Sequence, residues 1–237
     1  MEMQELFDAY LQHEKREEEN LMIAAFDDVC SSQYEEAAER FNQLYGKNPQ
    51  DYVSYFLRAY CKSHLGVRGN VYPDSQTLTS AFDLTIKKFF NSESKNPITF
   101  RLIISLYEDA MDNLFYNDPG ELKIGSNGSS YTTYPARAKI ISAKTTHVRS
   151  AIESNVEKIK KNSEMKKFCI QYLKDSGSLY DLRIVCSLDS SYQSEYDKKL
   201  KEKDARDAAA KKRNIIIGIV IAIFFAICLL SGLLGSL

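Results

Sequence analysis

The chain has 237 residues with a formal net charge of −1, and 27% of its residues are charged. A balance this close to neutral produces no global field that would attract nucleic acid, so no nucleic-acid partner is expected. The five cysteines form no CxxC pair, and the three histidines lie far apart without ligand-type neighbours. These patterns predict buried reduced thiols, no metal site and no cofactor.

The chain begins with a short amphipathic pattern over residues 2–16. Leu6, Phe7, Tyr10 and Leu11 form an i, i+4 stripe on one helical face, and a charged run, HEKREEEN, follows them. From Leu21 onward the apolar positions indicate a second helix, which ends near the Ser-Ser pair that precedes the next element.

A helix–turn–helix pattern covers residues 18–91. The pattern begins with a small residue. An aromatic residue follows four positions later, an apolar residue three positions after that, and a proline five positions further on. Asp51 then provides an N-cap for the next helix. The residues in phase are Tyr34, Ala37, Phe41, Leu44 and Pro49 in the first unit, and Tyr55 and Ala59 in the second. This spacing resembles the tetratricopeptide repeat, a helix–turn–helix unit of 34 residues.

The resemblance implies a specific packing of paired helices. The small side chain of Ala37 lets the paired helix approach, and Phe41 fills the gap beside it. Asp28 departs from the pattern because the family usually carries a tyrosine there. The second unit is interrupted by the insertion VRGNVYPDSQ, after which the helical spacing resumes about seven residues late. An unrelated helical bundle stays open as the alternative.

Stacked helix pairs of this family form a curved surface that binds peptides or partner proteins. Co-chaperones of the family grip a carboxylate with lysine and asparagine, but Met22 and Phe26 stand at those positions, so that activity is not implied. The resemblance instead implies an apolar groove, lined by the first-helix residues Met22, Phe26, Tyr52 and Phe56. Ordinary inter-helix core is the alternative for the same four residues.

After Pro97 the sequence ITFRLIISLYEDAMDNLFY predicts a long helix. Residues 117–134 are rich in Gly, Ser, Asn and Pro, which predicts a loop that is either functional or disordered. A phosphate-binding loop is excluded because no strand precedes it and no GK[ST] motif ends it. Tyr131 and Tyr134 are candidate contact or modification sites in this loop.

Further helices are predicted over residues 136–161, over a shorter stretch that closes near 175, and from Leu179 to Leu200. No stretch alternates like a strand series. We therefore expect one soluble all-α domain over residues 1–175, with tetratricopeptide-like pairs in a small solenoid or bundle.

A helical, basic juxtamembrane stalk is predicted over residues 176–213 and a transmembrane helix over 214–234. Residues 215–234 carry no charge, and twenty residues at 1.5 Å each give a helix of about 30 Å, the thickness of the hydrocarbon core of a bilayer. Basic residues precede this span and none follows it, which predicts a cytoplasmic N-terminal domain and a C-terminus across the membrane. No signal peptide is expected, so the layout is tail-anchored.

Small residues line one face of the predicted span. Gly218, Ala222 and Ala226 are spaced four apart, which lets two membrane helices approach closely. A homodimer through this face is therefore possible.

The sequence favours a membrane-tethered protein–protein interaction module, a scaffold or adaptor whose partners are an unknown protein or peptide and the lipid bilayer. The alternative is a SNARE-like or self-associating tail-anchored protein without a peptide groove. A SNARE-like protein needs an unbroken coiled-coil heptad pattern before the span, and Gly177 interrupts it. No enzyme is expected because the carboxylates have the spacing of a solvated helix surface.

Overall fold

The computed structural model describes residues 3–13, 18–65, 75–93, 95–118, 120–124 and 129–234, without the side chains of residues 135, 220 and 222–234. The chain divides into two compact units, Met1–Tyr172 and Leu173–Leu237, and each is described by itself.

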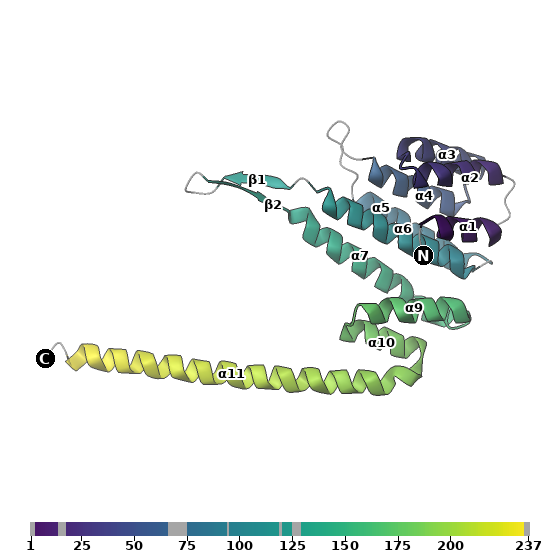
Figure 1. Ribbon diagram of the computed structural model, residues 1–237. Helices are drawn as coiled ribbons and strands as arrows, with labels where there is room; N and C mark the ends of the chain where they lie inside the picture. The colour runs from purple at the N-terminus through teal and green to yellow at the C-terminus, as the bar shows by residue number, and fades with distance from the viewer. Residues whose placement is uncertain are drawn as a thin grey trace. The chain divides into compact units, whose positions relative to one another are not determined.

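The first unit consists mainly of α-helices that pack in sequence order (Figure 1). Its helices are α1 (Met3–His13), α2 (Glu19–Cys30), α3 (Tyr34–Lys47), α4 (Tyr52–His64), α5 (Ser75–Asn91), α6 (Pro97–Tyr116), α7 (Pro135–Glu153), α8 (Val156–Ile159) and α9 (Ser163–Asp175), the last of which crosses the unit boundary. From α2 to α7 each helix packs on the next, and α4 also packs on α6 and α5 on α7. This helix–turn–helix packing is compatible with the predicted helical repeat.

Local capping explains where two of these helices begin. The Asp51 carboxylate accepts hydrogen bonds from the backbone N–H groups of Val53 at 3.1 Å and Ser54 at 3.2 Å, so the predicted N-cap is confirmed. The Asn96 side chain accepts from the N–H of Ile98 at 2.9 Å, and Pro97 occupies the first turn, where its missing N–H is not needed.

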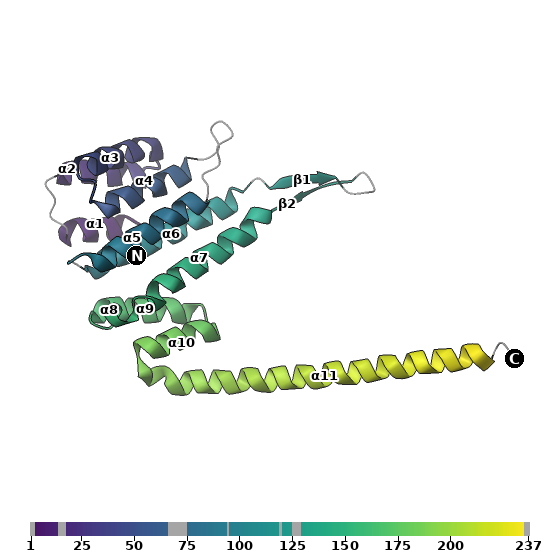
Figure 2. The same cartoon turned by 180° about the vertical axis from the view of Figure 1, so that it is seen from behind.

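The helix α6 is the centre of the first unit. It packs on α1, α4, α5 and α7 (Figure 2). Leu102, Ile103 and Ile104 are consecutive and all buried, and consecutive residues point to different sides of a helix. A helix covered on several sides carries apolar residues around most of its circumference, as α6 does.

The residues of the repeat pattern lie along the interface of α2, α3 and α4. Ala37, Phe41 and Leu44 are buried, whereas Tyr34, Tyr55 and Ala59 are half-buried and Pro49 is exposed. The ring centroids of Phe41 and Phe26 lie 5.8 Å apart, so the two side chains join α3 to α2.

The departure at Asp28 also has a structural role. Its carboxylate accepts a hydrogen bond from Nε of Arg40 at 2.5 Å, across α2 and α3. An ion pair therefore joins α2 to α3 at this position.

Two predicted elements differ from the structure. The helix predicted over residues 136–161 is interrupted between α7 and α8, because the Asn155 side chain donates to the backbone carbonyl of Ala151 at 2.8 Å and competes with the helical ladder. The predicted loop 117–134 contains an antiparallel hairpin of β1 (Glu121–Ile124) and β2 (Ser130–Thr133). The fold is thus α-helical with one small two-stranded sheet among the described residues.

The second unit contains α10 (Leu179–Leu188), the 3₁₀ turn η1 (Ser190–Tyr192) and α11 (Gln193–Leu234). The helix predicted from Leu179 to Leu200 is therefore interrupted. The Asp189 side chain accepts from the N–H of Ser191 at 3.1 Å and starts a new turn there.

In the part of the chain that the structure describes, no helix is long and apolar enough to cross a bilayer. Most of the predicted span falls on side chains outside the described set, namely residue 220 and residues 222–234.

Candidate interaction surface

The hairpin connects α6 to α7 and extends away from both (Figure 1). Its register pairs Glu121 with Thr133 and Ile124 with Ser130. Among the described residues no third strand pairs with it, so each strand leaves one edge unpaired, and such an edge presents backbone donors and acceptors to another chain.

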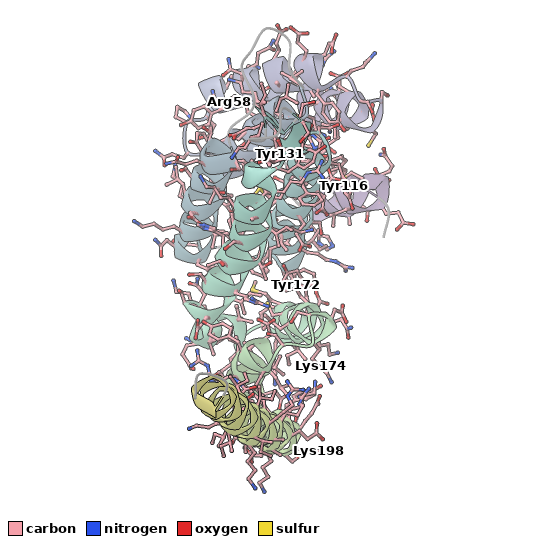
Figure 3. The ribbon with its side chains drawn as sticks, turned by 90° about the vertical axis from the view of Figure 1, so that its left-hand side faces the viewer. Arg58, Tyr116, Tyr131, Tyr172, Lys174 and Lys198 are labelled. Carbon is pink, nitrogen blue, oxygen red and sulfur yellow. The ribbon has the colours of Figure 1, made fainter. Side chains whose placement is uncertain are left out.

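The hairpin exposes large apolar side chains. Successive residues of a strand point to opposite faces, so Leu122 and Ile124 share one face and Tyr131 lies on the other. Leu122 is 73% exposed, Ile124 76% and Tyr131 51%, and Tyr116 at the end of α6 is 75% exposed. Figure 3 labels the side chains of Tyr116 and Tyr131. Exposed apolar residues that lie together mark interaction sites more often than isolated ones do, and Leu122 and Ile124 lie together on one face.

The base of the hairpin is tightly built. Gly120 adopts φ +69°, and a Cβ at this position would lie 2.6 Å from the Thr132 methyl carbon and 2.6 Å from the Thr133 carbonyl oxygen. Only glycine fits this conformation and this space. The Asp118 side chain accepts from the N–H of Gly120 at 3.0 Å, which fixes the turn that leads into β1.

Arg137 ties this base to α7. Its guanidinium lies 3.8 Å from the centroid of the Tyr134 ring and 5.0 Å from that of Phe115, and its Nε lies 3.9 Å from a carboxylate oxygen of Asp118. A cation between two aromatic rings and beside a carboxylate holds the ends of α6 and α7 together. A two-stranded hairpin is marginally stable alone, so this base supports it.

The sequence contained a signal for the hairpin that the loop prediction did not use. The runs ELKI and SYTT are separated by the five residues GSNGS, and a gap of three to five residues with glycine indicates a hairpin with a longer loop. Tyr131 and Tyr134, the two candidate contact residues, lie in β2 and directly after it.

The residues predicted to line an apolar groove lie elsewhere. Met22, Phe26 and Phe56 are buried and Tyr52 is half-buried. This burial agrees with the alternative reading of the same residues as inter-helix core. Phe26 is covered by α1, whose Phe7 ring stacks on it with the centroids 4.0 Å apart.

The predicted small-residue face of the span is described only at Gly218. A Cβ there would meet no heavy atom within 4 Å. Ala222 and Ala226 lie outside the described side chains.

Two histidines form pairs with carboxylates, which the sequence did not predict. His64 Nε2 lies 3.2 Å from Asp109 Oδ2, and the Tyr60 hydroxyl donates to the same oxygen at 2.7 Å. These bonds to His64 and Tyr60 lower the pKa of the Asp109 carboxyl below its ordinary value. The group joins α4 to α6.

The second pair, His147 Nδ1 and Asp83 Oδ1 at 3.0 Å, lies beside a hollow of about 260 Å³ between α5 and α7. Lys158 lines the same hollow, and its ammonium donates to the Phe90 carbonyl at the end of α5 at 2.9 Å. A cation on the last carbonyls stabilises a helix C-terminus. The side chains of His147, Asp83 and Lys158 that line this hollow thus make polar contacts within the fold.

The described part of the chain contains no cluster of three or more His, Cys, Asp or Glu side chains suited to a metal ion. Burial raises the pKa of the Cys169 thiol to about 12, and burial likewise raises the pKa of Cys61. Such thiols stay protonated at neutral pH and are poor nucleophiles.

The chain matches no protein-family model, no curated protein and no solved structure.

Proposed function

We propose that this protein is a membrane-tethered interaction module, a scaffold or adaptor, that presents the β1–β2 hairpin to a partner protein. The observation that carries the proposal is the hairpin itself: apolar side chains three-quarters exposed on a sheet with two unpaired edges. An extended segment of a partner can add a strand to such an edge, with main-chain hydrogen bonds for affinity and side-chain contacts for specificity.

The build of the hairpin base supports the same proposal. Gly120, Asp118 and Arg137 hold the strands in a defined position at the ends of α6 and α7. A binding surface held in place before its partner arrives loses less conformational entropy when the complex forms. The helical body is then the support, and the hairpin is the contact surface.

The tether belongs to the second unit. Ile215, Ile216, Ile217, Ile219 and Ile221 are each about half exposed on α11, between 48% and 60%. Five exposed isoleucines within seven residues favour an apolar cover, and a bilayer would supply one. The uncharged sequence of residues 215–234 and the lysines and arginines before it support an anchor with the first unit on the cytoplasmic side.

A photo-cross-linking experiment tests the contact surface. A photoreactive amino acid replaces Leu122 in the full chain in its native membranes, and a control replaces exposed Glu36 on α3. We expect position 122 to form adducts with one distinct protein and position 36 to form none with it. Adding Ile124→Ser to the position-122 chain should abolish these adducts.

Two results would overturn the proposal. Adducts from position 122 with other copies of this chain alone would favour a self-associating anchored protein. Equal adduct patterns from positions 122 and 36 would mean that the hairpin is no preferred contact surface.

A further inference from the structure

The N-terminal helix α1 (Met3–His13) covers a surface made by helices that are distant in the sequence. It packs on α2 and on α6. Leu6, Phe7 and Tyr10 are buried, while Glu5 and Asp8 are exposed. The helix is therefore amphipathic, with an apolar stripe toward the body and a polar face toward solvent.

Aromatic side chains make the central contact under α1. The Phe7 ring stacks on Phe26 of α2 at 4.0 Å between centroids and 11° between planes, and Tyr10 meets the same ring edge-on at 5.9 Å. Phe26 also contacts Phe41 of α3 at 5.8 Å. Phe26 thus contacts two aromatic residues of α1, Phe7 and Tyr10, which lie three positions apart in the sequence.

The geometry of this contact is that of a helix bound in a groove. An amphipathic helix that lays its apolar stripe on a surface between other helices, with anchor residues at i, i+3 or i+4, is a recurrent mode of peptide recognition. The helix α1 has 11 residues, and isolated helices of this length are marginal in water, so its helical state depends on the surface it covers.

We propose that the surface of α2 and α6 beneath α1 is a receptor for an amphipathic helix, that α1 occupies it within the chain, and that a partner helix with the same aromatic pair displaces α1. This inference does not depend on the hairpin or on the membrane tether. The partner is recognised by its chemistry: an aromatic pair at i and i+3, an apolar residue beside it and a polar outer face, as in the sequence LFDAY of α1.

The contact with α1 covers Phe26, one of the two residues of α2, Met22 and Phe26, at which a groove was expected. Both residues are buried, with exposed fractions of 0% and 1%. If α1 left this surface, Phe26 would lose its contacts with Phe7 and Tyr10 and would become available to another helix. The predicted location of the groove and the observed burial are then compatible.

Cys30 provides a native reporter of the position of α1. It is exposed on α2, and burial together with the negative charges of Asp27 and Asp8 raises the pKa of its thiol. Departure of α1 removes the Asp8 contribution, so the thiolate fraction of Cys30 and its alkylation rate should increase.

The test uses the full chain in detergent micelles and a fluorescent synthetic peptide of residues 1–13 as the probe. Phe7→Ala/Tyr10→Ala in the full chain should release α1 and allow saturable binding of the probe. Wild-type chain should bind the probe at least about tenfold more weakly, because its own α1 competes. A control peptide with the same two alanine substitutions should bind neither protein, and Cys30 should be alkylated faster in the variant.

Failure of the probe to bind a variant that keeps its helical circular dichroism and a cooperative unfolding transition would overturn the proposal. Hydrogen exchange of the wild-type chain provides a second test, which does not depend on the folding of the variant. We expect the amides of α1 to exchange at least about a hundredfold faster than those of α6, because α1 opens by itself. Exchange of both helices at one common rate would overturn the proposal.

Discussion

The helices α6 and α11 both carry long apolar stretches, but their surroundings differ. In α6, consecutive apolar residues are buried because α1, α4, α5 and α7 cover them. In α11, Ile216 is 60% exposed and Ile219 is 54% exposed. The same kind of side chain is thus buried by protein in α6 and exposed in α11. Burial makes the isoleucines of α6 part of the stable core, whereas those of α11 are the ones for which we propose an apolar cover in a membrane.

This comparison is tested most directly by replacing one isoleucine with alanine in each helix, so that the same atoms are removed from both. Ile103 of α6 is 0% exposed and Ile217 of α11 is 48% exposed. Ile103→Ala should lower the free energy of unfolding of the first unit by about 2–5 kcal/mol, because it leaves a cavity. Ile217→Ala should change that free energy by less than about 0.5 kcal/mol. Urea denaturation followed by circular dichroism measures both, and equal effects would contradict the comparison.

The hairpin that follows α6 depends on its base, which two glycine substitutions can test. Gly120→Ala places a side chain at positive φ against Thr132, at a cost of about 1–3 kcal/mol, so the hairpin amides should exchange about ten to a hundred times faster. The control is Gly177→Ala in the second unit, which has φ +65° and no atom within 4 Å of a Cβ. It should leave hairpin exchange unchanged, and an unchanged rate in Gly120→Ala would mean that the base does not hold the hairpin.

Two adjacent carboxylates of α6 should respond to pH in opposite directions. Burial raises the pKa of Glu108, whose carboxylate accepts a hydrogen bond from the Tyr172 hydroxyl at 2.8 Å, whereas the bonds from His64 and Tyr60 lower the pKa of Asp109. Glu108 therefore destabilises the fold at pH 7, and the fold gains stability as pH falls through the raised pKa. Asp109 stabilises the fold above its ordinary pKa of 3.8, and this contribution is lost as pH falls through the lowered value.

Substitutions separate these two carboxylates. At pH 7, Glu108→Gln should leave stability equal or higher, because the amide oxygen still accepts from Tyr172. Asp109→Asn should lower stability by no more than about 1 kcal/mol, since the Asp109 side chain is 46% exposed. Thermal unfolding between pH 3 and pH 7 measures both, and a shift of the same sign in the two variants would contradict the assignment.

The smallest effects are expected from exposed ion pairs. Lys144 and Asp112 join α7 to α6 at 2.7 Å, and Lys199 and Glu195 lie within α11 at 3.6 Å. Lys144→Ala should lower the stability of the first unit by about 0.5 kcal/mol, whereas Lys199→Ala should leave it unchanged. Adding 1 M salt should remove the difference, and a loss above about 2 kcal/mol in either variant would contradict this assignment.

The helical elements followed from local patterns in the sequence. The N-cap at Asp51 and the apolar positions of α6 are local signals, and both predicted their elements. The interruption at Asn155 was missed because apolar periodicity continues across it, and the interruption comes from a side-chain bond to the backbone.

The candidate surfaces were harder to predict because they depend on contacts between distant segments. For example, α1 covers Phe26 through Phe7, which lies nineteen positions earlier in the sequence, and no local pattern around Phe26 indicates this contact. The hairpin was missed for a different reason, since its strands are short and the glycines around them favoured a loop. Its local signal, a glycine-containing gap of five residues between two short runs, was present.

The most direct test of the account is flotation of the full chain with phospholipid vesicles in a density gradient at alkaline pH, which strips peripheral proteins. We predict that the wild-type chain floats with the vesicles and that Ile219→Lys/Ile221→Lys does not, since charge in the apolar part of α11 opposes insertion. The matched control, Ala208→Lys/Ala210→Lys in the exposed stretch before it, should float like the wild type. Wild-type chain that stays at the bottom of the gradient would contradict the membrane tether.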